Sequence, residues 1–162
     1  DLSLGQSEEA ADLLARAESA AAAAGQGPDA RIDLLVLAAR ALVNADRLDE
    51  AQQRLDAAKA LSADPGPRWR AMQGRLWTVR GRTEEGIAWL RAAITELAVA
   101  GPEDDFATSA RYALAEAIGF SGDHAGELAS LDETLSWQRA SLPAEHPQVL
   151  RTRLRRLVSL RL

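Results

Sequence analysis

The sequence has no cysteine, only one lysine and few aromatic residues. Without cysteine the chain can form neither a disulfide nor a thiolate metal site. Aromatic residues make up 4% of the chain, so alanine and leucine dominate its apolar 47%, and both favour helices over strands. Because Lys59 is the single lysine, arginine carries almost all of the positive charge.

Long apolar runs are also missing. The longest run, Leu34 to Ala39, is closed by Arg40 and is far shorter than the roughly 20 residues that span a bilayer. The net charge of −5 argues against a general nucleic-acid binder, although the segment from Glu145 onward carries five arginines against one acid. We therefore expect no membrane or nucleic-acid partner and a cytoplasmic location, with any targeting segment lying upstream of Asp1.

Helical periodicity runs through nearly the whole chain, and glycine and proline divide it into about eight segments. No segment alternates apolar and polar residues at period two, so we predict no sheet. Thr83 and Asp123 stand where each can cap the helix that follows. The predicted helices cover about residues 7–24, 29–44, 48–61, 68–80, 83–100, 103–120, 124–141 and 148–162.

Pairs of anchor residues, twelve apart, link successive helices. The pairs are Ala39 with Ala51, Gly74 with Gly86, and Ala115 with Glu127. A large apolar residue stands three positions after each first anchor and four after each second: Leu42, Trp77, Ile118, Leu55, Leu90 and Leu131. Small residues let two helices approach closely, and large ones fill the space between helix pairs. The pattern predicts stacked helix pairs, with Glu127 making the third pair the weakest match.

This frame resembles the tetratricopeptide repeat (TPR), in which a small residue is followed by an aromatic, a second small residue, another large residue and a proline. Gly74 with Trp77, followed by Gly86 with Leu90, fits it closely. The second anchors, preceded by Ala10 in a turn-and-helix start at residues 5–10, are spaced 41, 35 and 41 residues apart. The longer spacings, and the linker at residues 142–149, resemble the extended repeats of kinesin light chains and many bacterial multidomain proteins.

The resemblance implies an all-α fold, a right-handed α-solenoid of antiparallel helix pairs. The whole of residues 1–162 would form one array. It would begin with a partial repeat at 1–27, continue with repeats at about 28–66, 67–101 and 102–144, and end with a partial repeat at 145–162.

No set of residues in the sequence suggests catalysis, a metal site or a cofactor. His124 and His146 have no companion ligand at metal spacing, and no glycine-rich phosphate loop is present. Most of the paired acids fall in first helical turns, where they favour the helix dipole. The four tryptophans are best explained by packing. We therefore predict that the chain is not an enzyme.

The resemblance also implies a concave groove, lined by the first helix of each pair, that binds peptides. Arginine suits carboxylate-bearing peptides because its guanidinium donates forked hydrogen bonds. An alternative is that these arginines pair with neighbouring acids such as Glu116. The residues carried over to the groove are Arg40, Asn44, Arg68, Arg75, Tyr112 and Arg155.

Two functions are consistent with these observations. The first is a protein–protein interaction scaffold that binds a peptide or protein partner, acidic if the groove arginines are free. The second is the sensor or regulatory part of a larger bacterial protein kinase or transcription regulator. Self-association is a further expectation, because part of one apolar stripe of the last helix would lack a cover. That stripe consists of Val149, Leu150, Leu154, Leu157 and Val158.

Overall fold

The computed structural model describes residues 2–160, so the outermost ends of the predicted array, residues 1 and 161–162, lie outside the described residues. Eight α-helices and one short 3-10 turn fill this part of the chain, and it contains no strand. The elements are α1 (Leu2–Ala23), α2 (Pro28–Asn44), α3 (Leu48–Leu61), α4 (Pro67–Val79), α5 (Thr83–Leu97), η1 (Ala98–Ala100), α6 (Asp105–Phe120), α7 (His124–Arg139) and α8 (Pro147–Ser159).

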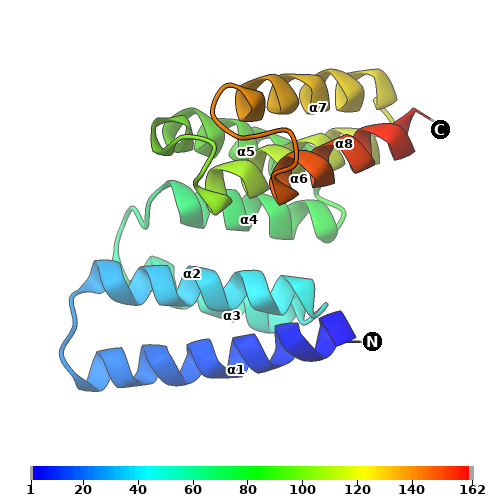
Figure 1. The fold of residues 1–162 in the computed structure, drawn as a ribbon. Helices are drawn as coiled ribbons and strands as arrows, with labels where there is room; N and C mark the ends of the chain where they lie inside the picture. The colour runs from blue at the N-terminus through cyan, green and yellow to red at the C-terminus, as the bar shows by residue number, and fades with distance from the viewer. Residues whose placement is uncertain (1, 161–162) are drawn as a thin grey trace.

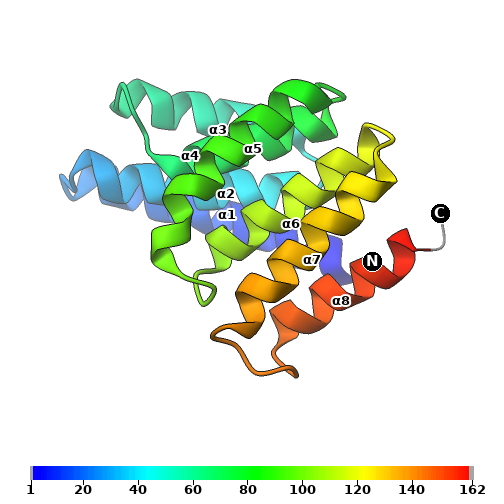
Figure 2. The same cartoon turned by 90° about the horizontal axis from the view of Figure 1, so that it is seen from above.

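Each helix packs antiparallel against the next, and the stack runs from α1 at one end to α7 and α8 at the other (Figure 1). The first helices of successive pairs also contact one another, α2 with α4 and α4 with α6. Seen from above, α8 lies along α7 and ends the stack (Figure 2). The predicted all-α stack of antiparallel helix pairs is confirmed. The exact repeat boundaries remain a prediction.

The turns inside the three complete pairs share one backbone conformation. Asp46, Gly81 and Gly122 all have positive φ, at 60°, 83° and 88°. This left-handed conformation is favourable for glycine and tolerated by aspartate. The three turn residues are 35 and 41 positions apart, which are the spacings of the helix anchors. The turns therefore follow the same repeat as the packing residues.

The second pair, α4 with α5, depends on two glycines that face each other. A Cβ atom on Gly86 would lie 2.7 Å from the Gly74 carbonyl oxygen and 2.2 Å from Thr78 Oγ1. Only a residue without a side chain fits at such a distance from backbone. In the first pair, Ala39 and Ala51 occupy the same positions and are fully buried.

Three tryptophans of the second pair pack together, and Trp69 and Trp89 also pack against the core of the first pair. Trp69 on α4 donates its indole N–H to the Leu55 carbonyl of α3 at 2.8 Å. Trp89 on α5 meets the rings of Trp69 and Trp77 edge to face, with centroids 5.5 and 5.2 Å away. These rings pack between helices, in agreement with the packing function predicted for them.

The third pair replaces small-residue packing with a buried ion pair. Glu127 of α7 is 0% exposed, and its Oε1 accepts from Arg155 Nε of α8 at 2.7 Å. Gly119 of α6 makes room for the carboxylate, since a Cβ atom there would lie 2.6 Å from Glu127 Oε2. The weak repeat match at Glu127 thus marks a polar contact among three helices.

Helix starts were predicted with mixed success. Asp123 caps α7 as predicted, accepting from the Gly126 N–H at 2.8 Å. Thr83 does not cap α5, because it is itself the first helical residue and no side chain caps that end. The α6 helix begins later than predicted because Asp104 supplies its cap, accepting from the Ala107 N–H at 2.8 Å.

The predicted turn at residues 5–10 is wrong, because these residues lie inside α1. Glycine lowers helix stability by only about 1 kcal/mol relative to alanine, which is too little to end a helix at Gly5. No described atom of another helix lies within 4 Å of the Cβ position at Gly5, so no neighbouring element bends the chain there. One residue of the apolar stripe of α8 is covered: Val149 is fully buried with Leu135 and Leu142. It faces inward because the buried face of α8 runs through Val149, Thr152 and Ser159 at helical spacing.

Candidate functional site

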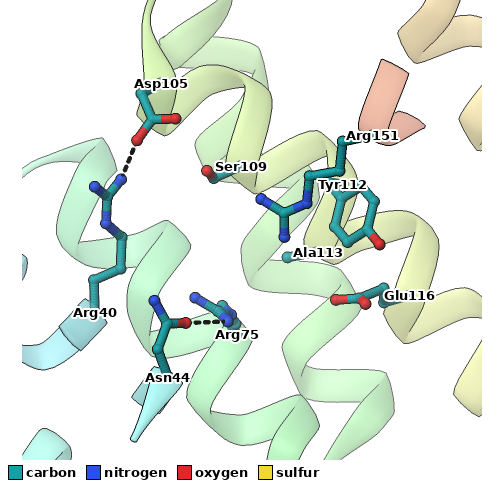
Figure 3. A pocket seen from close by; sticks show the side chains of 9 residues that line it. All are labelled: Arg40, Asn44, Arg75, Asp105, Ser109, Tyr112, Ala113, Glu116 and Arg151. Carbon is teal, nitrogen blue, oxygen red and sulfur yellow. Dashed lines mark hydrogen bonds and ion pairs between the residues drawn. The ribbon is translucent and has the colours of Figure 1, made fainter. Parts of the chain in front are cut away.

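A cavity of about 180 Å³ opens on the side of the stack formed by the first helices of the pairs, α2, α4 and α6, together with α8. Figure 3 shows its charged side chains converging from all four helices. We call it the arginine pocket. Its lining residues are Arg40, Asn44, Arg75, Asp105, Ser109, Tyr112, Ala113, Glu116 and Arg151.

Arg40 of α2 is neutralised at one edge of the pocket. Its Nη1 lies 2.5 Å from Asp105 Oδ2 of α6. Its guanidinium carbon also lies 4.9 Å from the centre of the Phe106 ring. Both contacts hold Arg40 against α6, so its charge is balanced within the protein.

Arg75 of α4 has no carboxylate partner among the residues of the structure. Its Nη2 donates to Asn44 Oδ1 at 2.8 Å (Figure 3). Burial lowers the pKa of Arg75, Glu116 opposes that effect, and the like charges of Arg151 and Arg40 add to it. Arginine stays protonated in proteins, so this cation is held in an environment that an incoming anion would improve.

Arg151 of α8 also lacks a carboxylate partner within the described part of the chain. Its guanidinium carbon lies 4.3 Å from the centre of the Tyr112 ring, a cation–π contact that orients the side chain across the pocket. The sequence analysis did not assign Arg151 to the groove. It lies one helical turn before the predicted Arg155, so a shift of four residues along α8 would have found it.

Glu116 of α6 is the second acid of the pocket. Neither a hydrogen bond nor an ion pair ties its carboxylate to another described residue. Burial raises the pKa of Glu116, and Glu127 adds to that effect, while Arg155, Arg75 and Arg151 lower it. The carboxylate is therefore pushed toward its neutral form despite three arginines in its surroundings.

The structure brings together four of the six predicted groove residues. Arg40, Asn44, Arg75 and Tyr112 line the arginine pocket, as described above. Arg68 lies outside the pocket, where it pairs with Asp104 at 2.9 Å.

Arg155 is also outside the pocket, because its guanidinium is held by Glu127. Other side chains on the helices of the groove are buried. These are Val36, Val43, Ala71, Thr78 and Ser159.

A second cavity, of about 370 Å³, adjoins the arginine pocket between α1 and α2. The two cavities share Arg40 and Asn44. We call the second one the aliphatic subsite, because half of its lining consists of apolar residues. These residues are Ala10, Leu14, Leu37 and Ala41.

The arginine pocket is suited to binding. With Glu116 ionised, three arginines and two acids leave it one net positive charge, and two guanidiniums have no carboxylate partner among the described residues. The part of the chain that the structure describes contains no group of histidines and acids arranged to hold a metal ion. No described helix is long and apolar enough to cross a membrane.

Comparison with known proteins supports the fold. Two solved structures are similar to the chain, both described as kinesin light chain "nearly identical TPR-like repeats" from Podosopora anserina, one being a single-substitution variant. Each is 20% identical, with TM-scores of 0.68 and 0.65, and the match covers 97% of this chain and 78% and 79% of theirs. The chain therefore has a TPR-like repeat fold. No protein-family model and no curated protein matches it.

Proposed function

We propose that the chain is a protein–protein interaction module whose arginine pocket binds an acidic segment of a partner. TPR-like repeats are generally scaffolds for protein partners, which makes a polypeptide ligand the first choice for this groove. The proposal adds the chemistry of the ligand and its place on the surface.

The observation that carries the proposal is the pair of free guanidiniums. Arg75 and Arg151 come from different helices, face one cavity and have no carboxylate partner within residues 2–160. Had both been paired within the protein, as Arg40 is with Asp105, the pocket would offer nothing to an anion. Guanidinium groups bind carboxylates with paired, charge-assisted hydrogen bonds.

The test is binding of a fluorescein-labelled library of glutamate- and aspartate-containing peptides, followed by anisotropy. The double variant Arg75→Gln, Arg151→Gln should lose at least about tenfold in affinity, since two charge-assisted contacts disappear. The matched control is Arg16→Gln, Arg153→Gln, which removes the same charge from exposed arginines on α1 and α8. Equal loss in both variants, or no loss in the first, would refute the pocket assignment.

The alternative, a sensor or regulatory region of a larger bacterial kinase or transcription regulator, stays a prediction that no feature of the fold favours. The cytoplasmic location also stays a prediction.

A further inference from the structure

We propose that the arginine pocket selects a segment with a single carboxylate next to an aliphatic side chain, and that Glu116 makes it reject phosphorylated segments. The inference rests on the proposed function and names the class of ligand. It follows from three features: the charge balance of the pocket, the position of Glu116 and the adjoining aliphatic subsite.

The charge balance favours a monoanion. While Glu116 is ionised the pocket carries one net positive charge, so one carboxylate neutralises it. A phosphate group brings about −1.5 to −2 at neutral pH, so it would leave surplus negative charge in the cavity. Arginine-rich sites normally suit phosphate well. In this pocket, however, Arg40 is already paired with Asp105, so only Arg75 and Arg151 remain to bind the ligand.

Glu116 sharpens the choice because it shares the cavity with the ligand. It lies between Arg75 of α4 and Arg151 and Arg155 of α8, with Glu127 of α7 adding negative charge. Burial already raises the pKa of Glu116, and a bound anion would raise it further. Anion binding and protonation of Glu116 are therefore linked, and the cost of binding grows with the charge of the ligand.

The pH dependence follows with a definite sign. Protonating Glu116 adds one positive charge to the pocket, so affinity for an anion should rise as pH falls through the raised pKa of Glu116. The arginines of the pocket keep their charge throughout, because guanidinium groups stay protonated in proteins. A ligand carboxylate with an ordinary pKa near about 4.3 stays ionised above pH 5.5.

The aliphatic subsite sets the neighbour of the carboxylate. It shares Arg40 and Asn44 with the arginine pocket, so one short segment can fill both cavities. Side chains on the same face of an extended peptide are about 7 Å apart, which suits adjoining cavities. Its volume of about 370 Å³ gives room for a leucine- or isoleucine-sized side chain.

Four labelled peptides test the inference by anisotropy, identical except for a Leu-x-Glu, Leu-x-Gln, Leu-x-phosphoserine or Ser-x-Glu core. The Leu-x-Glu peptide should bind at least about tenfold more tightly than the other three at pH 7.5. Its affinity should rise a few-fold between pH 8 and pH 5.5. Glu116→Gln should tighten binding of the phosphoserine peptide most and flatten the pH profile.

The matched control is Glu84→Gln, which removes an exposed carboxylate on α5, a helix that contributes no residue to the pocket lining. It should leave the ranking of the peptides and the pH profile unchanged. Circular dichroism of both variants checks that the fold is retained. Equal or tighter binding of the phosphoserine peptide by the wild type, or an unchanged pH profile in Glu116→Gln, would overturn this inference alone. Failure of all four peptides to bind would overturn the proposed function as well.

Discussion

Glu127 stands where the first two helix pairs have a small residue, and its carboxylate is out of contact with water. Such a group is stable only if its charge is compensated, and Arg155 does this through Nε and Nη2, at 2.7 and 2.6 Å from Oε1. The cost is that Arg155 is withdrawn from the groove. A single residue of the repeat frame therefore changes which arginine of α8 faces a ligand.

We expect Arg155→Ala to lower the free energy of unfolding by about 3 kcal/mol, because it leaves the buried Glu127 carboxylate with only the half-exposed His124, whose Nδ1 lies 3.8 Å from Oε2. The double variant Glu127→Ala, Arg155→Met removes both charges and should lose less stability than the single one. Urea unfolding followed by circular dichroism measures the two differences. A single variant as stable as the wild type would show that the ion pair is dispensable.

At the scale of elements, the approach of α4 to α5 is set by glycine. The Cβ atom of an alanine at position 86 would lie 2.7 Å from the Gly74 carbonyl oxygen. Because this oxygen belongs to the backbone, a change of side-chain rotamer cannot relieve the contact. The helices would have to separate, and the packing of Leu90 and Leu76, both fully buried, would loosen with them.

Gly86→Ala should therefore destabilise the chain by more than about 2 kcal/mol, although alanine is the better helix former. Gly27→Ala is the matched control, because its backbone is extended and nothing lies within 4 Å of the added Cβ atom. Because Gly27 is the N-cap residue of α2, where alanine is less favourable, that control should cost no more than about 1 kcal/mol. Thermal unfolding of both variants gives the comparison, and similar melting temperatures would contradict the close-packing argument.

At the scale of the whole molecule, the far end of the stack exposes a row of aliphatic side chains on α8. Leu154 and Leu157 are 64% and 57% exposed, and Leu150 and Val158 are about half exposed beside them. Apolar surface of this kind favours association, so the predicted self-association through the last helix has a defined surface.

We expect Leu154→Gln, Leu157→Gln to weaken concentration-dependent association without lowering the melting temperature by more than about 2 °C, since exposed side chains contribute little to folding. Sedimentation velocity over a range of concentrations is the measurement. Leu13→Gln, on an equally exposed leucine of α1, is the control and should leave association unchanged. A wild type that stays monomeric at every concentration would exclude this surface as an interface.

The sequence by itself determined the class of fold. Helical periodicity, the breakers between segments and the anchor pairs such as Gly74 with Gly86 were enough to predict eight helices in antiparallel pairs, because these signals are local or recur at fixed spacing. The resemblance to the TPR frame also placed Arg40, Asn44, Arg75 and Tyr112, which come together in one pocket. Helix starts were less predictable, as Thr83 and residues 5–10 show, because capping depends on one or two hydrogen bonds.

Only the tertiary structure decided which charges are free. Arg40, Arg68 and Arg155 look the same as Arg75 in the sequence, yet each of the first three pairs with an acid from another helix. The tertiary structure likewise decided that Arg151 lines the pocket and that Glu116 forms no ion pair with another described residue there. Ion pairing between helices depends on angstrom-scale distances across the stack, and helix periodicity fixes the face of a residue but not the side chain it meets.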